Sequence, residues 1–151
     1  MKAVVALGAN LADPKRAMEL AIAMLAEAAD LIAVSSLYIT KPVGGPAQPD
    51  YLNAVCLLES ELPALELLHL CQGIEKSLGR VRIERWGPRI IDIDLISYGD
   101  WMIADAELTL PHPHAHERRF VLEPWMEIDP DATLVAHGSI RELLAQLPPP
   151  E

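Results

Sequence analysis

Residues 1–39, MKAVVALGANLADPKRAMELAIAMLAEAADLIAVSSLYI, have the pattern of a strand, a helix and a second strand. The apolar run over residues 2–7 is typical of a strand, and residues 8–10 have the composition of a turn. Apolar side chains then recur at helical spacing, which predicts a helix over residues 14–28. Residues 31–39 are rich in β-formers and are expected to form the next strand.

The same order of elements repeats in the middle of the chain. We expect a strand over residues 53–61, a helix from residue 63 to residue 79 and a strand over residues 90–98. Two irregular loops, residues 40–50 and 79–89, separate these elements. Two split strand–helix–strand halves predict an α+β fold of the ferredoxin-like kind, an α/β sandwich with a βαββαβ core.

The last third of the chain adds to this core. Residues 99–100 have the composition of a hairpin turn that leads into residues 101–104, and a loop with a short helix is expected over residues 111–124. Ser139 and Glu142 form a capping box, which predicts a C-terminal helix. We therefore expect an added hairpin and C-terminal helices.

The composition is that of one globular domain, residues 1–151, with 51% apolar and 23% charged residues. A formal net charge of −10 argues against general binding to nucleic acids or anionic membranes, because phosphates attract local positive charge. No run approaches the roughly 20 apolar residues of a membrane span. Cys56 and Cys71 have no CxxC spacing and are expected to be buried thiols in a reducing compartment. We expect a cytoplasmic monomer.

Basic residues are concentrated in two short segments, although the chain as a whole is acidic. Seven of the twelve lie there: Lys76, Arg80, Arg82, Arg85, Arg89, Arg118 and Arg119. Because arginine suits two-pronged contacts with phosphate, these segments predict a local anion site. The alternative is a solvated basic loop.

Two carboxylates alternate with apolar residues in the strand that follows the first basic segment. Asp92 and Asp94 share one face of that strand, about 6.6 Å apart along it. Burying two carboxylates is costly without a cation, and Mg²⁺ is commonly held by one or two carboxylates together with substrate phosphates. The pair beside an arginine cluster predicts a site for a metal-bound polyphosphate. The alternative is an edge strand with an acidic face toward solvent.

Aromatic residues at two loop edges, Tyr51 and Phe120, predict a stacking slot for a flat ring, with Asn53 contacting a heterocyclic amide edge. Each aromatic taken alone is more often a core residue. Trp86 lies in a polar loop and is interpreted as a lid over a ligand. The sequence contains no Walker A or GxGxxG motif, so a nucleotide site here must be built from side chains.

The segment over residues 111–116 contains three histidines at alternate positions. A zinc site is disfavoured, because Pro113 fixes an extended turn and no further ligand lies at a suitable spacing. We expect His112 to contact phosphate, and His114 and His116 to be exposed.

Several short motifs also occur in a defined order. They are LGANL (7–11), QPDYLN (48–53), GRVR (79–82), RWGPRIIDIDLI (85–96), LPHP (110–113) and HERRF (116–120), within about residues 4–130. Together they resemble the 6-hydroxymethyl-7,8-dihydropterin pyrophosphokinases of folate biosynthesis. Ala9 differs from the serine that is frequent in this family, and the loop between Arg82 and Arg85 is short.

This resemblance implies a ferredoxin-like enzyme that moves the terminal pyrophosphoryl group of ATP to the hydroxymethyl oxygen of the reduced pterin, leaving AMP. It implies two Mg²⁺ ions, bound by Asp92 and Asp94. The triphosphate contacts implied are Arg80, Arg82, Arg89, His112 and Arg118. The implied catalytic residues are Arg80, Arg82, Arg89, Asp92 and Asp94. Gln72 and Glu75 match positions near the nucleotide.

The resemblance also implies a pterin pocket. Its residues are Tyr51 and Phe120 as a sandwich, Asn53 at the ring edge, backbone near Thr40 and Val43, and Trp86. Trp86 and Arg89 belong to a catalytic loop in this interpretation. Two other functions remain open: a metal-dependent nucleotidyl- or phosphotransferase with another acceptor, and a non-catalytic ferredoxin-like module that senses a nucleotide.

Overall fold

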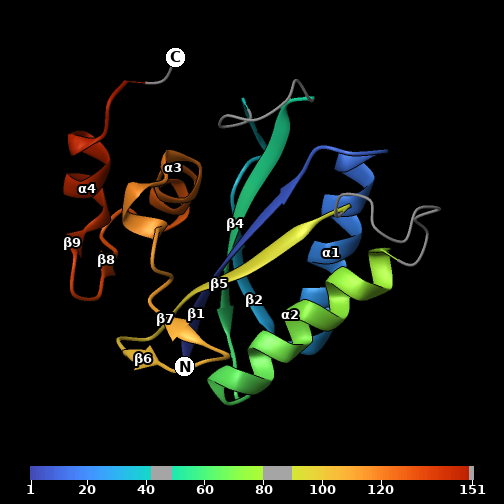
Figure 1. Cartoon of the computed structure of the whole chain (residues 1–151), viewed down its shortest axis with the longest axis horizontal. Coiled ribbons are helices and arrows are strands. Elements are labelled where there is room, and N and C mark those ends of the chain that lie inside the picture. The colour runs from blue at the N-terminus through green and yellow to red at the C-terminus, as the bar shows by residue number, and fades with distance from the viewer. Residues whose placement is uncertain (42–48, 80–89, 150–151) are drawn as a thin grey trace.

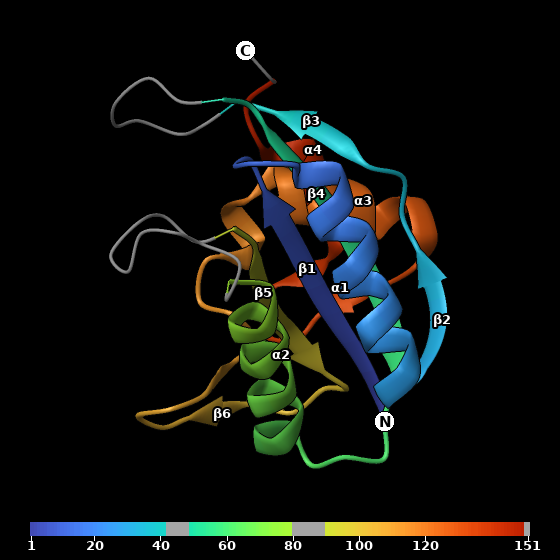
Figure 2. The same ribbon diagram turned by 90° about the vertical axis from the view of Figure 1, so that its right-hand side faces the viewer.

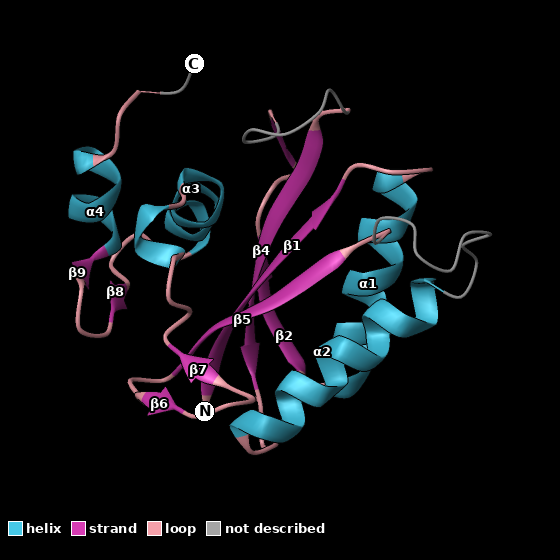
Figure 3. Ribbon diagram, in the orientation of Figure 1, coloured by secondary structure: helices cyan, strands magenta, loops and turns pink. Residues whose placement is uncertain are grey.

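A computed structural model describes residues 1–41, 49–79 and 90–149 of the chain. Figure 1 and Figure 3 show a mixed α/β arrangement with three layers, in which a central sheet lies between helices on either side. The elements, in chain order, are β1 (Lys2–Ala9), α1 (Pro14–Ala28), β2 (Asp30–Val34), β3 (Tyr38–Thr40), β4 (Tyr51–Glu59), α2 (Ala64–Gly79), β5 (Asp92–Tyr98), β6 (Ile103–Ala104), β7 (Thr109–Leu110), the 3₁₀ helix η1 (Ala115–Glu117), α3 (Arg119–Ile128), β8 (Thr133–Leu134), β9 (Gly138–Ser139) and α4 (Ile140–Gln146).

Among the residues that the structure describes, the central sheet has five strands, and every pairing between them is antiparallel. The strand order is β2-β4-β1-β5, with the short β3 also paired to β4. β1 and β4 therefore form the middle of the sheet, and β5 lies at one edge. This order places the C-terminal end of β1 between the N-terminal ends of β4 and β5.

Alternate side chains of β1 enter two different cores, as expected for a strand covered on both faces. Val5 packs into a cluster with Leu25 of α1 and Leu67 of α2. Val4 packs into a second cluster with Trp125 of α3. Figure 2 shows α1 and α2 in front of the sheet and α3 behind it. The second cluster ends short of Asp92 and Asp94, which leaves room for a site on the α3 side.

The predicted alternation of strands and helices is confirmed, but the predicted turn over residues 8–10 is wrong. β1 continues through Ala9, because Gly8 pairs with Asn53 on one side and with Asp92 on the other. The last strand begins at Asp92, slightly later than the sequence pattern indicated. Because β1 extends to Ala9, its backbone at Gly8 lies between Asn53 of β4 and Asp92 of β5.

The single strand expected over residues 31–39 is divided into β2 and β3. Ser35 causes the break, because its hydroxyl takes the place of a backbone acceptor for Val55. The Val55 amide donates to Ser35 Oγ at 2.9 Å, while the Ser35 amide donates to the Val55 carbonyl at 2.9 Å. Such local competition between a serine side chain and the ladder is difficult to foresee from a run of β-formers.

The predicted pairing of the hairpin after residue 98 is also wrong. A turn is present, in which the Trp101 amide donates to the Tyr98 carbonyl at 3.1 Å. However, Ile103 and Ala104 pair with Leu110 and Thr109 of β7 and not with β5. The helix expected within residues 111–124 is α3, which extends to Ile128.

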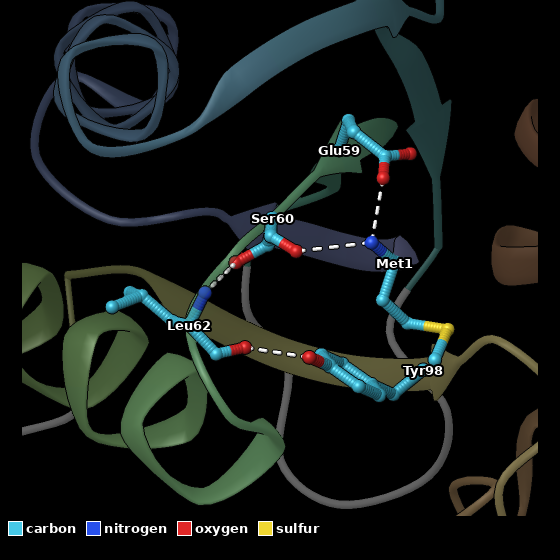
Figure 4. A network of polar contacts seen from close by, with 5 residues as sticks. All are labelled: Met1, Glu59, Ser60, Leu62 and Tyr98. Atoms are coloured by element: carbon cyan, nitrogen blue, oxygen red, sulfur yellow. Dashed lines mark hydrogen bonds and ion pairs between the residues drawn. The ribbon is translucent and has the colours of Figure 1, made fainter.

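A polar network fastens the end of the sheet that lies away from Gly8. The Met1 amino group donates to Glu59 at 2.5 Å and to the Ser60 carbonyl at 3.1 Å, and the Tyr98 hydroxyl donates to the Leu62 carbonyl at 2.6 Å (Figure 4). These contacts join the first residue, the end of β4 and the end of β5. This end of the sheet is therefore closed by contacts within the chain, and the opposite end carries the cleft described below.

Two further predictions concern the interior and membrane spans. Cys56 and Cys71 are free and buried, as predicted, and burial raises the pKa of each thiol to about 12. No helix within residues 1–41, 49–79 and 90–149 has the length and apolar character needed to cross a bilayer.

The N-cap of α4 is expected to contribute to the stability of the fold, and a single substitution tests this. Ser139 Oγ accepts a hydrogen bond from the Glu142 amide at 3.2 Å, which is the N-cap contact of the predicted capping box. We expect Ser139→Ala to lower the free energy of unfolding by about 1 kcal/mol, because one amide of the first turn loses its acceptor. Urea unfolding measures this change. Ser77→Ala, at an exposed position inside α2, is the control and is expected to cause no destabilisation.

Candidate active site

A cleft of about 670 Å³ opens on the α3 side of the sheet, above the C-terminal end of β1. Its walls come from β1, β3, β4, β5, η1 and α3, so segments far apart in the sequence meet there. Seven of the predicted site residues line it: Thr40, Tyr51, Asn53, Asp92, Asp94, Arg118 and Phe120. The sequence pattern therefore identified much of the described wall.

The floor of the cleft is one row of directly opposed residues across three strands. Gly8 of β1 lies opposite Asn53 of β4 and opposite Asp92 of β5. Directly opposed residues in antiparallel strands point to the same face. Asn53 and Asp92 are thus separated by a glycine. A Cβ atom on Gly8 would come within 3.0 Å of Asn53 Oδ1, so glycine keeps this row open.

Asn53 is held in place although its side chain is polar. The residue is 5% exposed, and its Nδ2 donates a hydrogen bond to Thr40 Oγ1 on β3. Buried amides need such partners, because an unpaired donor is costly away from water. The contact orients Asn53 and joins β3 to the cleft.

Asp92 and Asp94 lie on the cleft face of β5, as the alternation of its side chains predicted. Ile96, next on the same face, is buried against the second core. Both aspartates are partly buried at the place where that apolar core stops. A third carboxylate supports the strand from its outer edge, where Glu75 of α2 accepts a hydrogen bond from the Ile93 amide at 2.8 Å.

The segment before α3 forms the opposite side of the site. The His112 amide donates to the Ile96 carbonyl at 2.8 Å, which fastens this segment to β5. Burial lowers the pKa of His112; Asp94 opposes that shift, whereas Arg118 and His114 reinforce it. A neutral His112 accepts at Nδ1 from the His114 amide, at 3.2 Å, and carries its proton on Nε2.

The first residues of α3 bring a cation and an aromatic ring together. The Arg118 guanidinium lies 5.6 Å from the centroid of the Phe120 ring, and both side chains line the cleft. Arg119 also lines it, while its guanidinium donates to the Pro148 carbonyl at 2.9 Å. The site thus has an acidic side at β5 and a basic and aromatic side at α3.

Other predicted residues are placed differently. His112 and Glu75 adjoin the site without lining the cleft, and Gln72 is exposed on α2. His114 is exposed as predicted, but His116 is only partly exposed and stacks on His137 with ring centroids 4.1 Å apart. The predictions for Val43, Arg80, Arg82, Trp86 and Arg89 lie outside the described residues.

Several residues that line the cleft had no specific site role predicted from the sequence. They are Gly8, Lys41, His114, Glu117 and Arg119. Arg119 belongs to a basic segment of the predicted anion site, Gly8 and Glu117 lie within the LGANL and HERRF motifs, and Lys41 directly follows Thr40. His114 was expected to be exposed, and its proximity to the cleft depends on how η1 folds against the sheet.

Within residues 1–41, 49–79 and 90–149, no cluster of three or more His, Cys, Asp or Glu side chains is arranged to hold a metal ion. The described cleft offers two aspartates on one strand face instead. Such a pair has oxygen donors only, which suits a hard cation that also takes ligands from water or from a substrate phosphate.

The chain was compared with known proteins. Residues 4–130 match the model of the 7,8-dihydro-6-hydroxymethylpterin-pyrophosphokinase (HPPK) family. A Haemophilus influenzae protein named 2-amino-4-hydroxy-6-hydroxymethyldihydropteridine pyrophosphokinase is 42% identical over 146 residues, covering 95% of this chain and 91% of that protein. A Schizosaccharomyces pombe protein, named folic acid synthesis protein fol1, is 36% identical over 149 residues, covering 97% of this chain and 20% of that protein.

Solved structures agree with this relation at the level of the fold. The Plasmodium falciparum HPPK-DHPS wild-type crystal structure matches 96% of this chain with a TM-score of 0.75 and 15% sequence identity. The chain spans 44% of that longer protein, so the match describes the fold of the corresponding part. The family model and the sequence relatives each cover most of the chain, and the chain therefore belongs to the 7,8-dihydro-6-hydroxymethylpterin-pyrophosphokinase family.

Proposed function

We propose that the chain transfers the pyrophosphoryl group of ATP to the hydroxymethyl oxygen of 6-hydroxymethyl-7,8-dihydropterin, giving AMP and the pterin diphosphate for folate biosynthesis. Membership of the family supports this assignment. The observation that carries it is the row Asn53–Gly8–Asp92, which sets a polar, aromatic-lined pocket beside a carboxylate pair in one cleft.

The pterin occupies the end of the cleft formed by β3, β4 and the start of α3. Tyr51 and Phe120 stack on the two faces of the ring, and Asn53 contacts its amide edge. An amide side chain has two donors and one acceptor oxygen, and Asn53 uses a donor for Thr40. The backbone near Thr40 and Val43 completes the pocket.

The acidic end of the cleft suits Mg²⁺. Asp92 and Asp94 hold two ions in this proposal, and their oxygen-only donor set fits a cation that completes its shell with water and phosphate oxygens. When bound, Mg²⁺ neutralises charge on the phosphates being transferred. Through these ions, the two carboxylates would hold the polyphosphate near the hydroxymethyl group, because Asp92 lies on the side of Gly8 opposite Asn53.

Cationic and neutral donors complete the triphosphate site. Arg118 reaches the cleft from the start of α3, and a neutral His112 donates from Nε2. We assign the remaining triphosphate contacts to Arg80, Arg82 and Arg89, which with Asp92 and Asp94 form the catalytic set. We also assign a pterin-binding role to Trp86, and we propose that Gln72 and Glu75 contact the nucleotide. Fixed charges of this kind supply much of the catalysis in phosphoryl-type transfer.

We also propose that residues 1–151 form one ferredoxin-like domain with a βαββαβ core. The order β1, α1, β2, β4, α2, β5 along the chain and the order β2-β4-β1-β5 in the sheet support this description, with β3 as an addition. A cytoplasmic location is consistent with the two free cysteines. We also propose that the protein acts as a monomer.

Phosphorus NMR tests the reaction directly. The protein is incubated with ATP, Mg²⁺ and 6-hydroxymethyl-7,8-dihydropterin, and AMP together with a pterin diphosphate is the expected result. Formation of ADP would contradict pyrophosphoryl transfer. Turnover with another alcohol but not with the pterin would indicate a different acceptor, and ATP binding without turnover would favour a sensing module.

Gly8 provides a mutational test of the geometry of the cleft floor. We expect Gly8→Ala to raise the Kd for the pterin by roughly three- to tenfold, because the methyl group would crowd Asn53 Oδ1 at 3.0 Å and shift the amide. The Kd for ATP is expected to change less. Isothermal titration calorimetry with each substrate measures both constants.

A second glycine is the matched control for this substitution. Gly73 lies in α2, and a Cβ atom added there would meet no atom of another element within 4 Å, so Gly73→Ala is expected to leave both Kd values unchanged. The substitution is expected to stabilise the helix by about 0.5–1 kcal/mol. Equal pterin affinity in Gly8→Ala and in the wild type would contradict the proposed role of the Asn53–Gly8–Asp92 row.

A further inference from the structure

One carboxylate on α3 holds the connection between β2 and β3. The Ser36 amide donates to both oxygens of Glu127, at 3.1 Å to Oε1 and 3.0 Å to Oε2. The Ser36 hydroxyl donates to Oε2 at 3.1 Å, and the Tyr38 hydroxyl donates to Oε1 at 2.6 Å. We call this set of contacts the Glu127 latch. It joins residues 89 to 91 positions apart in the sequence.

β3 depends on such support because it is very short. It has three residues and pairs only with β4 among the described strands. Ile39, at its centre, is 74% exposed, so this side chain adds little burial to hold the strand. Short strands at the edge of a sheet are weakly held by their ladder alone.

The same strand carries part of the proposed pterin pocket. Tyr38 lies opposite Asn53, and Thr40 lies opposite Tyr51. The row on the cleft floor therefore continues from Asp92 through Gly8 and Asn53 to Tyr38. A displacement of β3 would move Thr40, whose hydroxyl accepts the hydrogen bond that orients Asn53.

Helix α3 connects the latch to the other wall of the cleft. Phe120 lies near its first residue, and Glu127 lies seven residues later, which places both on the same helical face about 10 Å apart along the axis. Phe120 lines the cleft, and Glu127 binds the β2–β3 connection. One helix thus sets the spacing between Phe120 and the β3 side of the pocket.

The latch pairs a phenol with a carboxylate at an exposed position. The hydrogen bond to Glu127, followed by burial, raises the pKa of Tyr38 to about 12, and Glu123 adds to this shift. The same hydrogen bond is the main reason that the pKa of Glu127 is lowered. A neutral phenol therefore donates to an ionised carboxylate, which is a strong type of hydrogen bond.

We propose that Glu127 is a positioning residue for pterin binding, which acts by holding β3 in register so that Thr40 orients Asn53 opposite Phe120. The identity of the ligand rests on the proposed function. Glu127 does not line the cleft, and its effect reaches the ligand through β3 and α3.

The test compares Glu127→Ala, Glu127→Gln and Tyr38→Phe with the wild type. Isothermal titration calorimetry gives the Kd for 6-hydroxymethyl-7,8-dihydropterin and, separately, for ATP. We expect Glu127→Ala to weaken pterin binding by about tenfold, while the Kd for ATP changes by less than about twofold. Tyr38→Phe keeps the Ser36 contacts, and Glu127→Gln keeps one acceptor oxygen, so each is expected to weaken pterin binding by roughly threefold.

Two measurements on the ligand-free protein follow the latch itself. Hydrogen exchange of the amides in residues 38–40 and 51–53 is expected to accelerate in Glu127→Ala. In the wild type, Tyr38 is expected to ionise near pH 12, and in Glu127→Ala this component of the tyrosine absorbance titration is expected to move toward pH 10. Glu66→Ala, which removes an exposed carboxylate from α2, is the matched control and should change none of these quantities.

The outcomes separate the two proposals. A wild-type protein that binds ATP but no pterin would overturn the proposed function. Wild-type pterin binding with an unchanged pterin Kd in Glu127→Ala would overturn only the positioning role. Equal losses of pterin and ATP affinity would also overturn it, because they would indicate general destabilisation. If Glu127→Ala fails to fold, Tyr38→Phe and Glu127→Gln provide the same comparison with smaller expected effects.

Discussion

Replacing Asp94 with asparagine is expected to lower kcat by about three orders of magnitude, because the proposed site would lose one of its two metal-binding carboxylates. Asp94 lies on β5 opposite Ala6 of β1, in a paired stretch of the sheet, and its side chain lines the cleft. Asparagine has nearly the same shape, so the backbone pairing should persist. The expected loss is therefore one of charge and not of fold.

In the absence of Mg²⁺, the same substitution should not lower the stability of the folded protein. Asp92 and Asp94 project from one face of a strand, so their negative charges repel each other when no cation lies between them. We expect Asp94→Asn to keep or slightly raise the free energy of unfolding in EDTA. An activity loss without a stability loss would separate a functional carboxylate from a structural one.

The effect of Mg²⁺ on the Tm tests the metal assignment without measuring turnover. In the presence of a non-hydrolysable ATP analogue, Mg²⁺ is expected to raise the Tm of the wild type, because a ligand that binds only the folded state stabilises it. This increment should be greatly reduced in Asp94→Asn. Asp100→Asn, at the exposed turn after β5, is the control and should keep both kcat and the increment. Asp94→Asn with kcat within about tenfold of the wild type would contradict the metal assignment.

The acidic side of the site was predictable because it depends on local order alone. In a strand, side chains two residues apart share a face, so Asp92 and Asp94 had to point together wherever β5 packed. The aromatic side required more. Tyr51 and Phe120 are far apart in the sequence, so their positions at loop edges and the motif resemblance could only suggest a shared slot, and the fold brings both to one cleft.

What sequence reasoning missed depends on contacts between distant residues. The Ser35 hydroxyl that ends β2 accepts a hydrogen bond from Val55, and Glu127 of α3 binds Ser36 and Tyr38. Neither contact has a local signature, because serine and glutamate are common at exposed positions. Gly8 was noticed as a turn residue, but its role as a spacer between Asn53 and Asp92 follows only from strand register.

Phe120→Ala is expected to weaken pterin binding by about 1–3 kcal/mol, a factor of roughly 5–150, because the ring of the ligand would lose a stacking surface. Phe120 is the single phenylalanine of the chain. It lines the cleft and also packs against the second core, so a loss of stability is expected as well. Calorimetric titration of the pterin, with a thermal melt of the same sample, separates the two effects.

Phe120→Leu distinguishes stacking from simple packing. Leucine retains most of the apolar volume but lacks a flat π-face, so the protein should keep most of its stability and still lose most of the pterin affinity. ATP affinity should change little in either variant, although Arg118 packs over the ring at 5.6 Å. Trp101→Ala, which removes an aromatic side chain that contacts Tyr98 away from the cleft, controls for general aromatic loss. If Phe120→Leu bound the pterin as tightly as the wild type, Phe120 would be a core residue at the edge of the pocket, and the face of the ligand would have to be recognised by Tyr51 alone.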